Sequence, residues 1–314
     1  MTKVTCLAGG VGAARILQGV VRVVSPEDVT VIVNTGDDMV LYGLNISPDI
    51  DIVTYTLAGI VDQEKGWGIE NDSFGFLEQM RRYGHDTWFG LGDRDLATHI
   101  NRTKLLKQGH SLSEVTRIHC NVFGVKTRII PMTDQKFETH IETSKGLMHF
   151  EEYLVKHRAD DMVQGVKFLG KESAKPAPGV IESILEADVV LIAPSNPIVS
   201  IGTILSLDGI REALVNTDAP VKGVSPIIGG KPVKGPADKL MSGLGYEVSA
   251  LSVALIYRDF LDHFVIDTVD RGMVEKIIEM GISVSVTNTI MRTMEDKIAL
   301  AETALTPQPG NRFV

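Results

Sequence analysis

The sequence predicts an α/β fold with a doubly wound, mainly parallel sheet. A strand at Thr2–Ala8, a helix at Ala13–Val24 and a second strand at Val29–Val33 form a β-α-β unit near the N-terminus. The same alternation of strand and helix returns late in the chain. The strands are continuous runs of Val, Ile and Leu, which is typical of parallel sheets covered by helices on both faces. We therefore expect a Rossmann-like domain.

The later elements follow in order along the chain. A helix is expected around Gly179–Ala187, and it leads into a very apolar strand at Asp188–Ala193. Further strands and intervening helices are expected at Val221–Val224, Pro236–Leu244, Phe264–Ile266, Met273–Met280 and Ser283–Val286. Together with the first unit, these elements are enough for one large sheet.

The middle of the chain departs from this alternation. It is mostly helical up to Cys120 and then has strand-like segments at Arg128–Pro131, Thr139–Thr143 and Met148–Tyr153. Because no linker or change of composition marks a boundary, we interpret residues 1–314 as a single domain. Residues from about 53 to 162 are then a mixed, largely helical insertion that covers the substrate and roofs the site.

Composition excludes several classes of protein. The net charge is −9 and no run of Lys or Arg occurs, so we expect no nucleic-acid partner and no anionic membrane surface. The two cysteines, Cys6 and Cys120, are far apart and form no disulfide framework, which favours a cytoplasmic protein. The longest apolar stretch, from Val189 to Leu205, is interrupted by prolines and polar residues and does not predict a membrane span.

The first glycine-rich turn is a candidate phosphate site. Gly9, Gly10 and Gly12 follow the first strand and open a helix, where free backbone N–H groups suit phosphate oxygens. The spacing differs from the dinucleotide fingerprint, and Asn34 stands where an acid would hold a ribose, so a nicotinamide cofactor is disfavoured. A tight turn without a ligand is the alternative.

Four carboxylates after the second strand are a candidate metal site. Asp37 and Asp38 end the second turn, and Asp49 and Asp51 follow within fifteen residues. Mg²⁺ typically takes one or two carboxylates together with substrate phosphates. The alternative is that these acids are ordinary turn residues.

The segment from Trp88 to His99 is a candidate pocket for a flat ring. Arg94 lies between two aspartates, of which Asp95 is the second, and close to the aromatic pair at 88–89. Alternatively, the acids cap the following helix and the aromatic pair is core.

Two further loops follow predicted strands. The loop after the strand at 188–193 contains Ser195, Asn196, Ser200 and Gly202, of which the last two would open a helix toward a phosphate. The loop at 225–236 contains two lysines, Lys231 and a second at 234, and either could neutralise a phosphoryl group or remain solvated. There is no GxSxG, HExxH or Walker A sequence, so the corresponding hydrolase and P-loop classes have no support.

In combination and order, these stretches resemble the 2-phospho-L-lactate transferase (CofD/FbiA) family, which acts late in the synthesis of the deazaflavin coenzyme F420. The likeness covers nearly the whole chain. Its segments are 7–12, 34–38, 48–51, 66–68, 88–99, 149–153, 193–202 and 225–231. Ser47 departs from the family, whose members usually have Cys before the Pro-Asp-x-Asp sequence.

The resemblance implies a Rossmann-like fold and a Mg²⁺-dependent transfer. Together with the large apolar fraction of the chain, it favours a homodimer. The donor would be a guanosine diphosphate ester of lactate or of a related acid such as phosphoenolpyruvate. The acceptor would be the deazaflavin alcohol Fo (7,8-didemethyl-8-hydroxy-5-deazariboflavin). Its terminal ribityl hydroxyl would attack the phosphorus that bears the acid, and GMP would leave. A non-catalytic regulator that binds nucleotides or nucleotide-sugars on the same fold is the alternative.

We derive a set of residue roles as hypotheses from this chemistry, which needs positioning and charge neutralisation more than a covalent nucleophile. Metal would bind Asp49 with Asp37 or Asp38, and Asp51 would accept or orient the proton of the hydroxyl, so that Asp49 and Asp51 are the catalytic residues. Fo would contact Asp49, Trp88, Arg94 and Asp95. The nucleotide would contact Gly9, Gly10, Gly12, Ser195, Asn196, Ser200, Gly202 and Lys231.

Overall fold

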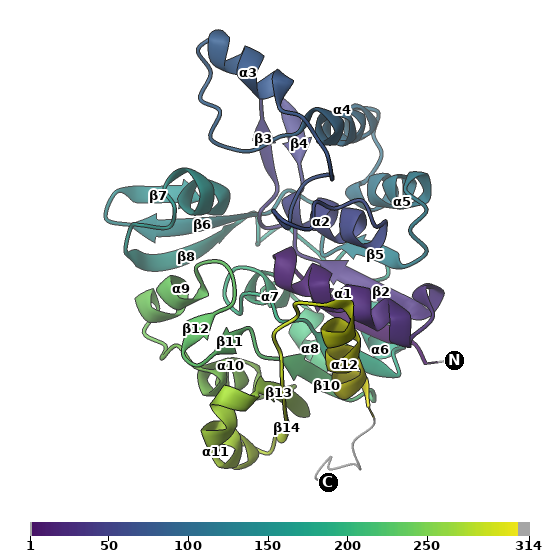
Figure 1. Ribbon diagram of the computed structural model, residues 1–314, viewed down its shortest axis with the longest axis vertical. Helices are drawn as coiled ribbons and strands as arrows, with labels where there is room; N and C mark the ends of the chain where they lie inside the picture. The colour runs from purple at the N-terminus through teal and green to yellow at the C-terminus, as the bar shows by residue number, and fades with distance from the viewer. Residues whose placement is uncertain (1, 307–314) are drawn as a thin grey trace.

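The structure is a computed structural model that describes residues 2–306. Its centre is a seven-stranded parallel sheet with the order β14-β13-β10-β9-β1-β2-β5 (Figure 1). The strands are β1 (Val4–Ala8), β2 (Val29–Val33), β5 (Arg128–Pro131), β9 (Val189–Ile192), β10 (Val221–Val224), β13 (His263–Asp267) and β14 (Ser283–Thr287). The predicted α/β, Rossmann-like fold with a mainly parallel sheet is therefore confirmed.

Helices cover both faces of the sheet. Alternate residues of each strand point to opposite faces, so Cys6 of β1 joins one buried cluster and its neighbour Leu7 joins the other. The first cluster includes residues of α1 (Gly10–Val23), α2 (Pro48–Leu57), α5 (Leu112–Val122) and α12 (Met294–Leu305). The second includes residues of α6 (Val180–Leu185), α7 (Ile201–Leu205), α8 (Ile210–Asn216), α9 (Ala237–Gly243), α10 (Ala250–Tyr257) and α11 (Val274–Ile278).

Smaller elements extend from this core. At the top of Figure 1 lie the hairpin β3 (Met39–Leu41) and β4 (Leu44–Ile46), α3 (Gly75–Arg82) and α4 (Asp93–Lys107). A three-stranded antiparallel sheet consists of β6 (Glu138–Thr143), β7 (Gly146–His149) and β8 (Val163–Leu169). The remaining short elements are the hairpin β11 (Ile227–Ile228) and β12 (Lys231–Pro232), two 3₁₀ turns at Pro26–Asp28 and Thr268–Met273, and a π-helical turn at Glu152–Lys156.

The middle of the chain is divided between these parts. Its strand β5 pairs in parallel with β2 and forms one edge of the central sheet, so residues 53–162 contribute to the core as well as to elements outside it. The expected strand Met148–Tyr153 is wrong beyond His149. Phe150 and Tyr153, three residues apart, are both buried in the cluster that contains Ile141, and a helical turn allows this whereas an extended strand would point them apart.

The connection between β1 and β9 determines where a ligand can bind. The chain leaves β1 toward β2 on one side, whereas β9 lies on the other side of β1 and leads to β10. Loops therefore diverge at the carboxyl ends of β1 and β9, which is where open parallel sheets bind their ligands.

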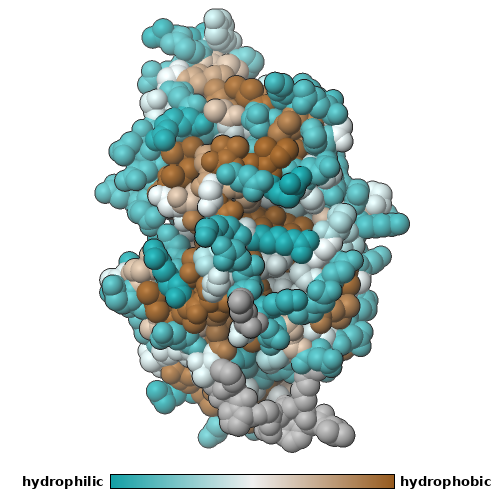
Figure 2. Space-filling view, turned by 90° about the vertical axis from the view of Figure 1, so that its right-hand side faces the viewer, coloured by the Kyte–Doolittle hydropathy of each residue, from teal (hydrophilic) through white to brown (hydrophobic). Residues whose placement is uncertain are grey.

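The surface mixes polar and apolar side chains. The face in Figure 2 shows brown areas interrupted by teal ones, with the largest brown area in its upper half. Exposed large apolar side chains include Tyr83, Val122, Met162 and Val269. Within residues 2–306, no helix combines the length and the hydropathy that crossing a bilayer requires.

Candidate active site

A cavity of about 870 Å³ opens at the carboxyl ends of β1 and β9. One side is formed by the glycine loop at 9–12 together with residues 194–200. The other contributions come from the start of α2, from residues 150–155, and from the loops at 225–237 and 289–292. This is the position that the topology predicts for a ligand.

The two loops at the centre of the cavity pack against each other closely. The Gly9 N–H donates to Ser195 Oγ at 3.2 Å. A Cβ at position 9 would lie 2.7 Å from Ser200 Cβ, and one at position 12 would lie 2.3 Å from the Pro194 carbonyl oxygen. The glycines are therefore required by close approach of the loops, and Gly9, Gly12, Ser195 and Ser200 are brought together as the sequence predicts.

Asn34 connects the end of β2 with the first turn of α2. Its Nδ2 donates to Asp49 Oδ2 at 2.9 Å, and its Oδ1 accepts from the Gly36 N–H at 2.8 Å. The Gly10 N–H also donates to the Asp49 carboxylate. Asn34, which stands where a dinucleotide-binding protein would have an acid, thus holds the Asp49 carboxylate in the cavity wall.

Three buried carboxylates line the same part of the cavity: Asp37, Asp49 and Glu151. Burial, followed by the charges of Asp49 and Glu151, raises the pKa of Asp37 well above its usual range. Burial raises the pKa of Asp49 to about 6, and burial together with the charge of Asp49 raises the pKa of Glu151 to about 8. We call these three residues the acidic cluster. Their mutual repulsion is what a bound cation would relieve.

Glu151 has no role among the sequence-based hypotheses. The only signal for it was its place in the 149–153 segment of the family resemblance. It follows β7, outside the central sheet, and no spacing in the sequence indicates that it meets Asp37 and Asp49.

Asp38 lies behind the cavity and is not part of its wall. Its Oδ2 accepts from Ser47 Oγ at 2.7 Å, and its Oδ1 is buried without a hydrogen-bond partner among the described residues. Burial raises the pKa of Asp38 well above its usual range, although the hydrogen bond from Ser47 opposes this. The side chain at position 47, where the sequence departs from the family pattern, therefore supports an acid next to the site.

Asp51 belongs to a separate buried network. Arg102, which is only 1% exposed, forms an ion pair with Asp51 Oδ1 and donates to His99 Nδ1 at 3.1 Å. Burial raises the pKa of Asp51, and the Arg102 charge opposes this rise. Asp51 Oδ2 has no hydrogen-bond partner among the described residues, and Asp51 is in the cavity wall. One oxygen is thus held by Arg102, while the other is buried without a hydrogen bond and lies near the His99 ring.

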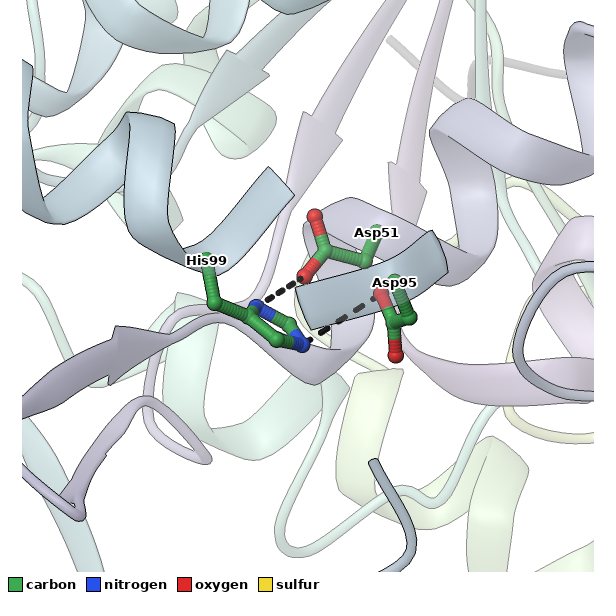
Figure 3. Close-up of side chains that lie close together, drawn as sticks. All are labelled: Asp51, Asp95 and His99. Atoms are coloured by element: carbon green, nitrogen blue, oxygen red, sulfur yellow. Dashed lines mark ion pairs between the residues drawn. The ribbon is translucent and has the colours of Figure 1, made fainter. Parts of the chain in front are cut away.

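His99 lies between two carboxylates, as Figure 3 shows. Its Nε2 is 3.3 Å from Asp95 Oδ1 and its Nδ1 is 3.6 Å from Asp51 Oδ2. Because an arginine N–H can only donate, Nδ1 accepts from Arg102 and the proton of a neutral ring belongs on Nε2. Tyr55 Oη donates to Asp95 Oδ1 at 2.7 Å, which places Asp95 at the end of the network. Burial raises the pKa of Asp95, but the close His99 ring, the hydrogen bond from Tyr55 and the charge of Arg102 outweigh burial and lower it.

Asp51, Asp95 and His99 also offer three potential metal ligands. One ligand atom of each lies within 4.8 Å of the other two. The set contains an imidazole nitrogen, and Asp51 already pairs with the Arg102 cation. The acidic cluster, by contrast, consists of carboxylate oxygens with no arginine or lysine ion pair among the described residues, so it suits Mg²⁺ better.

The predicted aromatic segment is placed only partly at the cavity. Phe89 and Gly90 line it, together with Trp67, whose ring lies 2.6 Å from where a Cβ at position 90 would be. Trp88 packs edge-on against Phe89 at 5.6 Å between ring centroids and is not in the cavity wall.

Arg94 is exposed and donates to the Glu70 carbonyl oxygen at 2.9 Å, away from the cavity wall. Aspartates do cap helices here, but the aspartate that caps α4 lies outside the 88–99 segment, and Asp93 caps α3 instead of α4. Asp72 accepts from the N–H groups of Arg94 and Asp95 at the start of α4, and Asp93 accepts from the Gly75 and Phe76 N–H groups at the start of α3.

The remaining predicted residues are divided in the same way. Asn196 lines the cavity and its Oδ1 accepts from the Ile198 N–H at 2.9 Å. Gly202 lies within α7, next to the Pro197 carbonyl oxygen, and Lys231 is exposed on β12. Neither is in the cavity wall, whereas Lys234 is.

Comparison with known proteins agrees with the resemblance. The family model for 2-phospho-L-lactate transferase CofD matches residues 4–303. A phosphoenolpyruvate transferase of Kitasatospora aureofaciens is 46% identical and aligned over 96% of this chain and 97% of its own length. A 2-phospho-L-lactate transferase of Methanosarcina mazei is 43% identical over 94% and 97%, respectively.

Among solved structures, a UPF0052-family protein of Bacillus halodurans has a TM-score of 0.66 and covers 97% of this chain and 99% of its own. Its 17% identity shows a shared fold alone. The family model and the two relatives carry the assignment. The chain belongs to the CofD family of 2-phospho-L-lactate transferases.

Proposed function

We propose that this protein transfers a 2-phospho-L-lactyl or phosphoenolpyruvyl group from a GDP-linked donor to the terminal ribityl hydroxyl of Fo, with Mg²⁺, in coenzyme F420 synthesis. One observation carries the proposal: the glycine loop and the acidic cluster meet in one cavity at the divergence of β1 and β9. Backbone amides and carboxylates in that arrangement suit a metal-bound diphosphate.

The metal would bind the acidic cluster. Asp37 Oδ1 is buried without a hydrogen-bond partner among the described residues, and each carboxylate disfavours the ionised form of another. These features fit a divalent cation held by Asp37 and Asp49, with Glu151 added to the predicted pair. Bound Mg²⁺ would neutralise the developing charge on the diphosphate. Asp38, also among the predicted ligands, would support the set from behind.

Asp51 would accept the proton of the attacking hydroxyl. Asp51 lines the cavity, its Oδ2 makes no hydrogen bond among the described residues, and Arg102 fixes the other oxygen. In the proposed step, the ribityl oxygen forms a bond to the phosphorus that bears the acid, and the bond from that phosphorus to the bridging oxygen breaks. The proton passes to Asp51, GMP leaves with the bridging oxygen, and a phosphodiester remains.

The glycine loop and residues 195–200 would hold the guanosine diphosphate part. The Fo ring would lie against the aromatic part of the wall, where Trp67 is 40% exposed and Phe89 is half-buried. The sequence-based candidates for Fo are Asp49, Trp88, Arg94 and Asp95, and of these Asp49 and Asp95 line the cavity. Trp67 is therefore the aromatic contact we add to the proposal.

We propose two candidates for the three-carbon acid of the donor, lactate and phosphoenolpyruvate. The compared relatives bear both names at similar identity, 46% and 43%. Lactyl-2-diphospho-5'-guanosine and its phosphoenolpyruvyl counterpart are the two donors to compare.

The test is the release of GMP when the purified protein is mixed with Mg²⁺, Fo and each donor in turn. We expect GMP and the phosphodiester in equal amounts with one or both donors, and neither product when Fo is omitted. Tight nucleotide binding without GMP release would instead identify the alternative function, a nucleotide-binding regulator.

A further inference from the structure

The cavity wall contains a group of basic side chains in addition to the acidic cluster. Arg15, Lys234 and Lys297 all line the cavity, and they come from α1, from the loop after β12 and from α12. We call these three residues the cation cluster. The chain as a whole is acidic, with a net charge of −9, so a group of three cations around one cavity is not a consequence of overall composition.

Local packing holds the cation cluster in place. Lys297 Nζ donates to Gln18 Oε1 at 2.6 Å, one turn beyond Arg15 on α1. A Cβ at Gly19 would lie 2.1 Å from the Lys297 carbonyl oxygen, so α12 and α1 are in close contact at this point. Lys234 Nζ donates to the Lys65 carbonyl oxygen at 3.2 Å. The three cations are therefore brought together by three separate segments.

The positive charges of the cation cluster are not matched by carboxylate partners in the part of the chain that the structure describes. Within residues 2–306, none of the three side chains forms an ion pair with a carboxylate. Burial, followed by the charge of Arg15, lowers the pKa of both Lys234 and Lys297. Lys297 is buried and Arg15 is half-buried, whereas Lys234 is exposed. Like charges gathered in this way are unfavourable where they lose water, unless an anion neutralises them. The cavity therefore offers a place for an anion that needs no metal.

We propose that the cation cluster is an oxyanion subsite for the donor, separate from the metal-binding acidic cluster. Arginine and lysine bind phosphate and carboxylate alike, and a GDP-linked acid presents both groups. The subsite follows from the three residues, whereas the identity of its ligand as the donor rests on the proposed function. Arg292 lines the same cavity from the loop before α12 and adds to the positive potential there.

The test is isothermal titration calorimetry with GDP and with lactyl-2-diphospho-5'-guanosine, in EDTA so that the metal does not contribute. The variants are Arg15→Met and Lys234→Met, which remove one charge each and retain most of the apolar side chain. Lys297→Met is a third variant at a more buried position. Arg22→Met, an exposed residue on the last turn of α1, is the matched control.

We expect each cluster variant to weaken binding by about tenfold or more, and Arg22→Met to leave it unchanged. If both ligands lose affinity, the subsite takes a phosphate of the nucleotide. If only the GDP-linked acid does, the subsite takes the carboxylate.

Unchanged affinity of both ligands in folded Arg15→Met and Lys234→Met proteins, checked by thermal melting, would overturn the subsite. This readout is independent of turnover. A protein that releases no GMP with Fo but binds GDP through the cluster would refute the proposed function and retain the subsite.

Discussion

Asn34 at the end of β2 donates a hydrogen bond of 2.9 Å to Asp49 in the first turn of α2. Asp49 also accepts from the Gly10 N–H. One carboxylate thus joins the ends of two neighbouring strands with the helix that follows the hairpin β3–β4. This hydrogen bond fixes the Asp49 carboxylate in the cavity wall. A substitution that keeps the bond but removes the charge therefore tests the role of Asp49 in the reaction.

We expect Asp49→Asn to reduce turnover by roughly a hundredfold or more, since it removes a metal ligand and a charge at the reacting diphosphate. The melting temperature should not fall, because the amide oxygen can still accept the hydrogen bond from Asn34 and the change removes one charge from the acidic cluster. Steady-state GMP release and differential scanning fluorimetry measure the two effects. Full Mg²⁺-dependent turnover would remove Asp49 from the mechanism.

The acidic cluster predicts an unusual pH dependence of stability. The pKa of Asp49 is raised to about 6 and that of Glu151 to about 8 in the folded protein. The folded chain therefore binds more protons at these sites than the unfolded chain between about pH 4 and 8. Their contribution to the free energy of unfolding is full below pH 4 and is lost as the pH rises through this window.

Glu151→Gln should flatten this loss, particularly between pH 6 and 8, by an amount on the order of a few kcal/mol. Urea denaturation of metal-free protein at a series of pH values measures it, with the exposed residue change Glu172→Gln as control. A profile for Glu151→Gln that parallels the wild type would contradict the buried acidic cluster.

Mg²⁺ should stabilise the protein through the same carboxylates. At a hundredfold excess over its Kd, a bound ion adds about 2.7 kcal/mol, which corresponds to roughly 5 °C in melting temperature for a chain of this size. The shift should be larger at pH 8 than at pH 5, because protonated carboxyls do not bind the ion.

Asp37→Asn is the variant for this prediction, and Asp208→Asn, at an exposed residue in the turn between α7 and α8, is its control. Melting curves with and without Mg²⁺ should show the shift in the control and not in Asp37→Asn. An equal shift in both would assign the metal elsewhere, with Asp51, Asp95 and His99 as the next set to change.

The buried ion pair between Arg102 and Asp51 predicts a strong energetic coupling between the two residues. Arg102→Met leaves the buried Asp51 carboxylate without its partner and should cost about 3–5 kcal/mol of stability. Asp51→Asn combined with Arg102→Met should cost less than Arg102→Met alone, because the unpaired charge is then absent. Urea denaturation of the two single variants and the double variant gives the coupling energy. Additive effects of the two substitutions would mean a coupling energy of zero and would contradict the stabilising role of the ion pair.

The two tryptophans are expected to differ in their contribution to Fo binding. Trp67 lines the cavity, whereas Trp88 packs on Phe89 outside its wall. We expect Trp67→Leu to weaken Fo binding by about twofold to tenfold through loss of ring contact, and Trp88→Leu to have a smaller effect. Titration of Fo fluorescence measures both. The reverse order would restore Trp88 as the main aromatic contact.

The central sheet was predictable from sequence because its signals are local. Val29–Val33, for example, is an unbroken β-branched run, and β2 has these bounds in the structure. The predicted strand beyond His149 was wrong because tertiary burial of Phe150 and Tyr153 decided the backbone there. Local pattern is least informative where distant segments supply the core.

The site was predictable in part for the same reason. Gly9 and Ser195 lie at strand ends, and parallel strands bring such ends together, so their meeting follows from the fold. Glu151, Arg102 and Trp67 arrive from the middle of the chain, whose position relative to the sheet has no periodic signal. Only the family resemblance included two of their segments, at 66–68 and 149–153.

The contact between Gly19 and Lys297 has a consequence for synthesis of the chain on the ribosome. Helix α1 packs against α12, and Gly19 and Lys297 are 278 positions apart in the sequence (297 − 19). An emerging β1–α1 unit therefore lacks the apolar cover that α12 gives to α1 until residues 294–305 have been made. Nascent chains arrested before α12 should be sensitive to protease at α1, and nucleotide should protect them only after that last helix has left the exit tunnel.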